Sequence, residues 1–107
     1  MDIDFLVKRA GKIAKDKGFN KIKSQDNSFK DFHRHIKSEL KELKKAVKPW
    51  EPIDHTTTFY DPNSCEAEIA DIIIRTASYC DLIGVDLNKA VMEKMFYNSK
   101  RLPGKEY

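Results

Sequence analysis

Few residues in this sequence could cross-link the chain or anchor it in a membrane. The 107 residues include only two cysteines, four glycines and four prolines. Cys65 and Cys80 are too few and too widely separated for a zinc site, and we expect both to be reduced thiols. No apolar stretch reaches the roughly 18 residues that a membrane-spanning helix requires. These absences argue against a zinc-binding module and against a membrane-spanning protein.

A strong excess of one charge is also missing. Charged residues make up 35% of the sequence, but the net charge is only +3. This balance is typical of a soluble, helix-rich protein and does not single out nucleic acid as a partner. The acidic start, Met1 to Asp4, does not resemble a signal peptide, so we expect a cytoplasmic protein. A chain of this length fits one domain, which covers residues 1–107.

Apolar residues recur at helical spacing in four segments, and turn-forming residues separate these segments. The first predicted helix begins at Ile3 and ends at Gly18. The second is predicted to begin at Ser28, which forms a pattern resembling a capping box with Asp31. Pro49 is expected to end it, because proline breaks a helix interior.

The second half of the sequence contains two further predicted helices. Residues 50–62 come first and form a loop that is long for a compact helical domain. The third helix is predicted to begin at Asn63 and to end at Gly84. The isoleucines at 72–74 are also compatible with a buried strand, but the cap residues and the length favour a helix. Asp86 is the predicted N-cap of the fourth helix.

These segments predict an all-α fold, specifically a four-helix bundle. A domain of this size buries only a modest core, and the third helix is apolar on more than one side. The isoleucines responsible are Ile69, Ile72, Ile73 and Ile74. We therefore expect the surplus apolar surface to be buried in a homo-oligomer, most simply a dimer.

Two pairs of acidic residues carry the most specific chemical signal. Glu39 and Glu42 are three residues apart in the second helix, and so are Glu68 and Asp71 in the third, so each pair shares one helix face. An antiparallel return of the chain would bring both pairs to the same end of the bundle. Four carboxylates suit a hard cation such as Mg²⁺, which prefers oxygen ligands. For Glu39 and Glu42 taken alone, a solvated charged face stays the alternative, because lysines surround them.

The fourth helix offers groups that complement these acids. Lys94, Asn98 and Arg101 are spaced i, i+4 and i+7 and therefore share a face, and Lys105 follows close by. A polyphosphate bridged to carboxylates by a metal ion needs cations and amide donors on its outer oxygens. We expect these four residues to contact the substrate.

The acidic pattern, Glu39 and Glu42 followed by Glu68 and Asp71, resembles the MazG-like family of all-α nucleoside triphosphate pyrophosphohydrolases, and so do three ordered blocks of the sequence. The blocks are Ser28 to Leu40, Glu68 to Arg75, and Gly84 to Leu87 together with Glu93 to Arg101. The ordered set is more specific than either acidic pair alone. The resemblance covers most of residues 28–105.

The resemblance implies hydrolysis of a nucleoside triphosphate, often a deoxynucleotide or a non-standard nucleotide, to a monophosphate and pyrophosphate. The four acidic residues would bind Mg²⁺, with Mn²⁺ as a substitute, or one of them would orient the attacking water as a base. Lys94, Asn98 and Arg101 would contact phosphates. Members of this family work as homodimers or larger homo-oligomers, with sites near subunit contacts.

Two other functions stay open at this point. The chain is compatible with a non-catalytic helical module of the same fold that binds a nucleotide or a protein. It is also compatible with a small nucleic-acid-binding bundle, because lysine and arginine give the first helix a basic face, although no reader motif accompanies it. Metal-dependent pyrophosphate release would distinguish the enzyme from the first alternative. A steep salt dependence of DNA or RNA binding would support the second.

Several conspicuous side chains have a structural interpretation. Arg75 lies one turn after Asp71 and is expected to form a structural ion pair with a carboxylate. His33 and His35 are expected at the surface. Trp50 could stack on a base, and lid packing or an oligomer contact fits it equally well.

Overall fold

The computed structural model consists of helices alone in the part of the chain that it describes, which is residues 1–19, 21, 24–47 and 61–101. Its elements are α1 (Ile3–Asp16), α2 (Gln25–Val47), α3 (Cys65–Ile83) and α4 (Leu87–Ser99). The expected all-α class and four helices are therefore confirmed for these residues. The three consecutive isoleucines lie in α3, so the helix interpretation of that segment is correct. Most of the predicted 50–62 loop lies outside the described residues.

Side-chain caps mark where α1 and α4 begin, and the cap of α4 is the predicted one. The Asp86 side chain accepts a hydrogen bond from the backbone N–H of Lys89 at 3.1 Å, which confirms it as the N-cap of α4. Asp2 caps α1 in the same way, through the N–H of Phe5 at 2.7 Å. Gly84 ends α3 with φ of 79°, a left-handed conformation that glycine adopts without strain.

Two predicted helix starts are wrong. Ser28 lies buried one turn inside α2, and Ser24 accepts the hydrogen bond of the first turn, from the N–H of Asn27 at 3.2 Å. This first turn is polar and exposed, so apolar periodicity could not reveal it. At α3 the cap is Ser64 rather than Asn63, and its Oγ accepts from the N–H of Ala67 at 3.2 Å.

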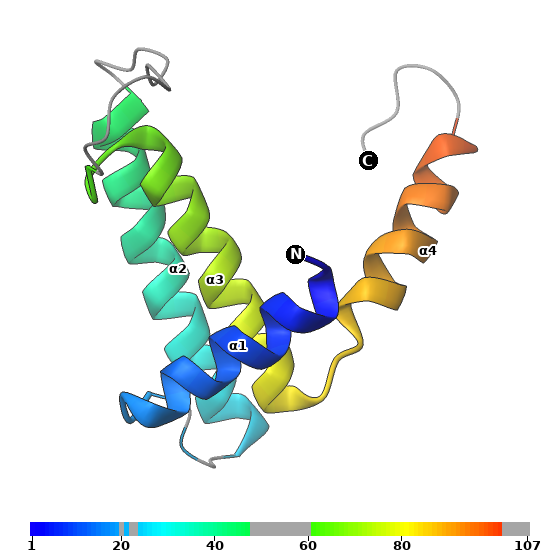
Figure 1. Ribbon diagram of the computed structural model, residues 1–107, viewed down its shortest axis with the longest axis horizontal. Helices are drawn as coiled ribbons and strands as arrows, with labels where there is room; N and C mark the ends of the chain where they lie inside the picture. The colour runs from blue at the N-terminus through cyan, green and yellow to red at the C-terminus, as the bar shows by residue number, and fades with distance from the viewer. Residues whose placement is uncertain (20, 22–23, 48–60, 102–107) are drawn as a thin grey trace.

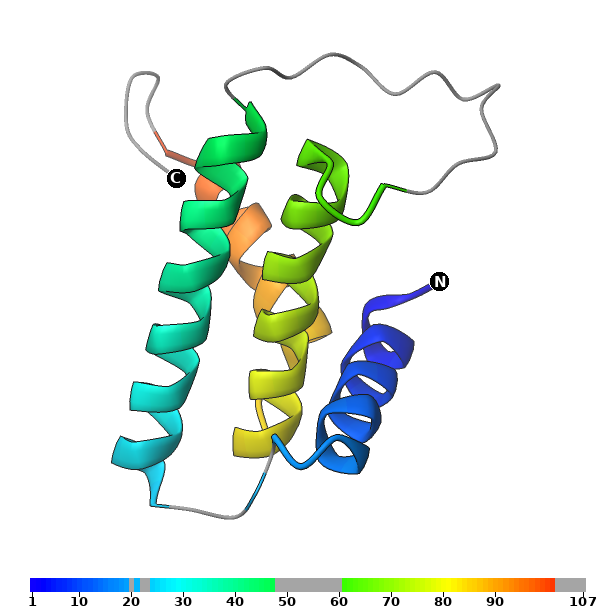
Figure 2. The same ribbon diagram turned by 90° about the vertical axis from the view of Figure 1, so that its left-hand side faces the viewer.

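Helices α1 and α2 both pack against α3. Helices α2 and α3 run antiparallel side by side, and α1 packs across α3 on another side (Figures 1 and 2). The crossing of α1 over α3 is close at Gly11, where an added Cβ would meet the side chain of Asp81, including its Cβ at 2.7 Å. A glycine at this position therefore allows the two helices to approach.

Helix α4 leaves this group of three helices. It contacts α1 near the start of the chain and then extends away from α2 and α3, as Figure 1 shows. Its apolar side chains remain outside the core, with Phe96 67% and Met95 65% exposed. In one copy of the chain the fourth helix therefore does not close a bundle.

The core of the described residues is small. Its buried apolar members are Ala10, Cys65, Ala67, Ala77 and Cys80, and no large side chain is fully buried. Several isoleucines and leucines of the predicted apolar stripes are about half exposed, among them Leu40 and Ile73. Both cysteines are free thiols, as expected. Within the described part, no helix is both long and apolar enough to cross a membrane.

Candidate functional site

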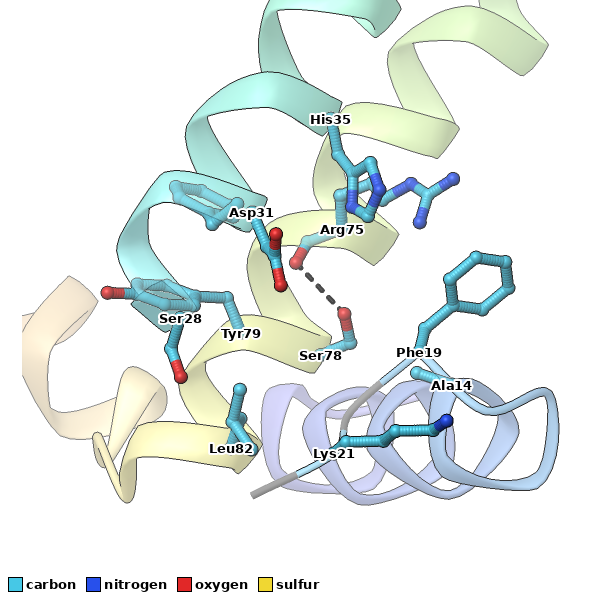
Figure 3. A pocket seen from close by; sticks show the side chains of 11 residues that line it. Ala14, Phe19, Lys21, Ser28, Asp31, His35, Arg75, Ser78, Tyr79 and Leu82 are labelled. Carbon is cyan, nitrogen blue, oxygen red and sulfur yellow. Dashed lines mark hydrogen bonds between the residues drawn. The ribbon is translucent and has the colours of Figure 1, made fainter. Parts of the chain in front are cut away.

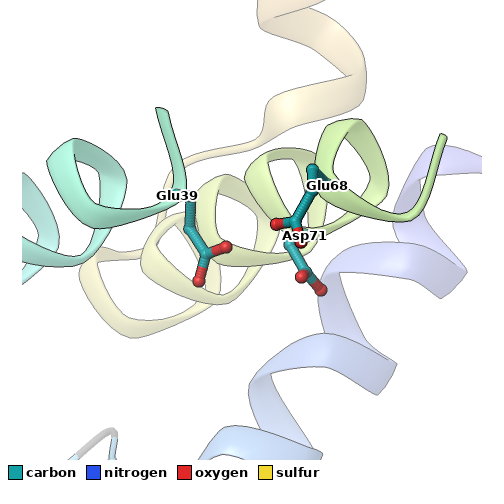
Figure 4. A group of neighbouring side chains, drawn as sticks. All are labelled: Glu39, Glu68 and Asp71. Atoms are coloured by element: carbon teal, nitrogen blue, oxygen red, sulfur yellow. The ribbon is translucent and has the colours of Figure 1, made fainter. Parts of the chain in front are cut away.

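The antiparallel packing of α2 and α3 brings three carboxylates of the two predicted pairs together. Glu39 projects from α2, and Glu68 and Asp71 project from adjacent turns of α3 (Figure 4). One oxygen from each carboxylate lies within 4.8 Å of the others. We call Glu39, Glu68 and Asp71 the acidic cluster. It arises because the i, i+3 pair of α3 and one member of the α2 pair, Glu39, face the same interface.

Glu42 stands beside this cluster rather than in it. Its carboxylate forms an ion pair with Lys45 at 3.4 Å on the exposed side of α2. Its negative charge nevertheless acts on Glu68, where it contributes to the shift of the pKa described below. The structure thus brings three of the four predicted acids into one close group and leaves Glu42 at its edge.

Glu68 occupies the most constrained position of the cluster. The residue is only 5% exposed, and in the described part of the chain its carboxylate has no hydrogen bond or ion pair. Burial raises the pKa of the Glu68 carboxyl above its ordinary value, and the charges of Asp71, Glu39 and Glu42 raise it further. A buried acid surrounded by like charges is unfavourable unless a cation compensates it.

The raised pKa predicts that Glu68 destabilises the metal-free protein at neutral pH. The folded state holds this proton more tightly than the unfolded state, so its stabilising contribution is present below about pH 4.5 and is lost as pH rises through the folded pKa. Glu68→Gln cannot ionise and should therefore have the higher Tm at pH 8 in EDTA, with a gap that shrinks toward pH 4. Thermal unfolding followed by circular dichroism measures this. A constant gap between pH 4 and pH 8 would contradict the assignment.

The cluster has the donor set of a Mg²⁺ site. Oxygens on opposite sides of a Mg²⁺ ion are about 4.2 Å apart, given bonds of roughly 2.1 Å. Neighbouring ligand oxygens lie closer together, at about 3.0 Å. The three carboxylate oxygens, which lie within 4.8 Å of one another, would therefore move closer together around a bound ion. Oxygen ligands alone, with no histidine or cysteine among them, favour a hard cation over zinc.

A cation of the protein already approaches the cluster. The Nε of Arg75 lies 3.5 Å from Oε1 of Glu39, and both side chains are largely shielded from solvent. The guanidinium also lies over the ring of Phe19, with Cζ 5.4 Å from the ring centroid. The expected ion pair of Arg75 with a carboxylate is therefore present, and its partner is a member of the acidic cluster.

Two hollows meet at Arg75. The first, which we call the aromatic hollow, lies between α2, α3 and the segment after α1, and Phe19, His35 and Tyr79 are among its walls (Figure 3). The second, the acid-side hollow, lies between α1 and α3. Its lining includes the acids Glu39 and Asp71 together with Lys17, Phe19 and Arg75. His35 is thus half-buried in a hollow, which corrects the expectation of a surface histidine.

The predicted phosphate contacts lie elsewhere in the single chain. Lys94 and Arg101 both stand against the ring of Tyr97, at 4.7 and 5.8 Å from its centroid, so they do share a face of α4 or its end. Asn98 lies between them, and its buried Oδ1 accepts no hydrogen bond in the described part. Because α4 extends away from α2 and α3, this face is remote from the acidic cluster of its own chain. Lys105 lies outside the described residues.

Comparison with known proteins gives no match: no family model, no curated protein and no solved structure is significantly similar to this chain. The resemblance to the MazG-like family therefore stays a prediction that rests on the sequence blocks.

The sequence predicts the ion pair of Arg75, but its patterns do not identify Phe19 and Lys17, which line the acid-side hollow with it. Arg75 lies four residues after Asp71, so the spacing already places both on one face of α3. Phe19 follows α1 and lies outside any helical repeat. Only the packing of α1 against α3 brings it to Arg75.

Proposed function

We propose that the protein is a Mg²⁺-dependent nucleoside triphosphate pyrophosphohydrolase of the MazG-like kind, which releases a monophosphate and pyrophosphate. The observation that carries the proposal is Glu68, a buried carboxylate without hydrogen bond or ion pair in the described part, with Glu39 and Asp71 within 4.8 Å. Such an arrangement is costly in the absence of a cation and suits Mg²⁺ when one is bound.

Each element of the site has a part in this chemistry. Glu39, Glu68 and Asp71 would hold the cation, which supplies charge neutralisation for the phosphates and lowers the pKa of a bound water. Glu42 lies at the edge of the cluster and is not one of its three proposed metal ligands, so it is the candidate for orienting a water molecule. The cytoplasm, where nucleotide pools and reduced thiols occur, is the compartment that this function fits.

We further propose that the protein works as a homodimer or a larger homo-oligomer. The support is the small core, the exposed apolar side chains of α4 and the divergence of α4 from α2 and α3. A second copy would cover this apolar surface. It would also bring the face of Lys94, Asn98 and Arg101 to an acidic cluster that its own chain does not place nearby.

The direct test is a panel of ribonucleoside and deoxynucleoside triphosphates, assayed for pyrophosphate release with Mg²⁺, with Mn²⁺ and with EDTA. We expect release of pyrophosphate, not of orthophosphate, from at least one nucleotide, and we expect EDTA to stop it. A folded protein that releases pyrophosphate from no member of the panel would refute the proposed activity.

A mixing experiment tests whether two copies share a site. Alone, Asp71→Asn should be nearly inactive and Arg101→Ala should be weakened. A dimer with one copy of each variant would contain one site in which both Asp71 and Arg101 are native. Mixing equal amounts after mild denaturation and refolding should restore about a quarter of wild-type activity in a statistical dimer.

The matched control mixes Asp71→Asn with Glu68→Gln. Both changes affect the acidic cluster of one chain, so no mixed dimer regains an intact site. Recovery in neither mixture, or a monomeric mass by light scattering at micromolar concentration, would show that copies do not share the site.

One observation favours a second function, a helical interaction module without catalysis. The exposed apolar side chains of α4 give the chain a surface that a partner protein could cover, whatever the acidic cluster does. This function predicts partner binding that EDTA does not affect and no pyrophosphate release. The nucleotide panel therefore separates the two.

A further inference from the structure

Arg75 is a charged side chain that contacts the acidic cluster and lines both hollows. It lines the aromatic hollow and the acid-side hollow, and its Nε pairs with Glu39 at 3.5 Å. With the cluster free of metal, this pair neutralises part of a group of carboxylates that would otherwise repel one another.

Within the described residues, no hydrogen bond uses the terminal nitrogens of Arg75. In the described part, the guanidinium makes the Glu39 ion pair and the Phe19 ring contact, and it donates no hydrogen bond. A guanidinium has five N–H donors in a planar fork, and pairing through Nε leaves the outer ones available for a second anion. The Phe19 ring lies against the guanidinium, with its centroid 5.4 Å from Cζ.

Metal binding would change the partner of Arg75. Glu39 cannot keep its full interaction with the guanidinium and also serve a divalent cation, because the two positive charges compete for one carboxylate. Arg75 then needs another anion beside the cation. The acid-side hollow, which also has Lys17 in its wall, leaves an empty volume of about 620 Å³ there, counting the space that opens to solvent.

We propose that Arg75 is a substrate-binding residue: it pairs with Glu39 while the cluster lacks a metal ion, and it donates to a phosphate oxygen of the substrate once the ion occupies the cluster. This inference rests on the proposed function and adds to it a phosphate contact within the same chain as the acids. The contact is distinct from those on α4. A charge-assisted fork of this kind is the usual protein donor for phosphate oxygens.

The test uses Mn²⁺ alone and then inorganic tripolyphosphate with Mn²⁺ present, both followed by isothermal titration calorimetry. Tripolyphosphate has no base, so it reports on phosphate contacts only. Arg75→Met keeps the apolar stem and removes the charge. We expect it to bind Mn²⁺ as tightly as the wild type or a few-fold more tightly, because a competing positive charge is gone. It should bind tripolyphosphate about tenfold to a hundredfold more weakly, as loss of a charge-assisted hydrogen bond predicts.

Two variants make the comparison specific. Arg75→Lys keeps the charge without the fork and should retain part of the tripolyphosphate affinity. It also serves as the test if Arg75→Met does not fold. Arg9→Met makes the same chemical change on the exposed face of α1 and should leave both affinities unchanged.

The outcomes separate this inference from the function on which it rests. A parallel loss of Mn²⁺ and tripolyphosphate affinity in Arg75→Met would show a structural role in holding Glu39 and would overturn the inference. Tripolyphosphate affinity within twofold of wild type would also overturn it, while leaving the pyrophosphohydrolase proposal intact. A folded wild-type protein that binds no Mn²⁺ would overturn both.

Discussion

Asp71→Asn is expected to abolish metal-dependent pyrophosphate release while leaving the helices intact. Asparagine has nearly the same shape as aspartate, but it removes one of three charges that lie together in the acidic cluster. Loss of a ligand charge weakens the binding of the cation, which neutralises the phosphates and positions the water. We therefore expect kcat/KM to fall by about a thousandfold or more. Pyrophosphate release at saturating Mg²⁺, with circular dichroism as the check on folding, measures it.

Two further variants test whether the loss of activity in Asp71→Asn comes from the acidic cluster. Asp16→Asn removes an equal charge from an exposed ion pair with Lys12 on α1, and such pairs contribute little, so activity should not change. Arg101→Ala removes an expected phosphate contact and should raise KM with a smaller effect on Mn²⁺ affinity. A folded Asp71→Asn protein with full activity would show that the acidic cluster is not the metal site.

Gly11→Ala should destabilise the protein, although alanine is the better helix former. In an open helix position this change is favourable by about 1 kcal/mol. At Gly11 the new Cβ would meet Cβ of Asp81 at 2.7 Å, and it would also meet that residue's carboxylate. A side-chain rotation cannot move a Cβ, so α1 and α3 must separate, and overpacking of this kind costs about 1–3 kcal/mol. Urea unfolding at constant pH gives the free energy of unfolding.

A double-mutant cycle with Asp81→Gly isolates the contact. That background removes the three Asp81 atoms that would lie nearest to the new methyl group, so Gly11→Ala should there lose its penalty or become stabilising. Equal costs of Gly11→Ala in both backgrounds would show that the α1–α3 approach does not depend on this pair. Stabilisation in the native background would contradict the close crossing itself.

The predictions that succeeded from sequence depend on neighbours within about four residues. Asp86 and Gly84 were correctly assigned as helix ends, because a cap is a local hydrogen-bond or backbone requirement. The start of α2 at Gln25 was missed because its first turn is polar and exposed, which gives apolar periodicity nothing to detect.

The candidate site shows the same division. Helical spacing alone placed Glu68 and Asp71 on one face of α3, and the structure agrees with that spacing. The spacing of Glu39 and Glu42 could not tell which of the two would face α3, since that depends on how α2 is rotated about its axis. Packing directs Glu39 to the cluster and leaves Glu42 with Lys45 at the exposed side.

For the residues that the structure describes, the sequence by itself determined the all-helical class, the four helices and the faces that carry acidic and basic side chains. Each of these follows from the 3.6-residue repeat and from local caps. Only the tertiary structure decided which faces meet. Small residues such as Gly11 set the approach of α1 to α3, and this approach brings Phe19 to Arg75 beside Glu39. The divergence of α4 is likewise a tertiary property, since the direction of a helix after a turn depends on the packing that receives it.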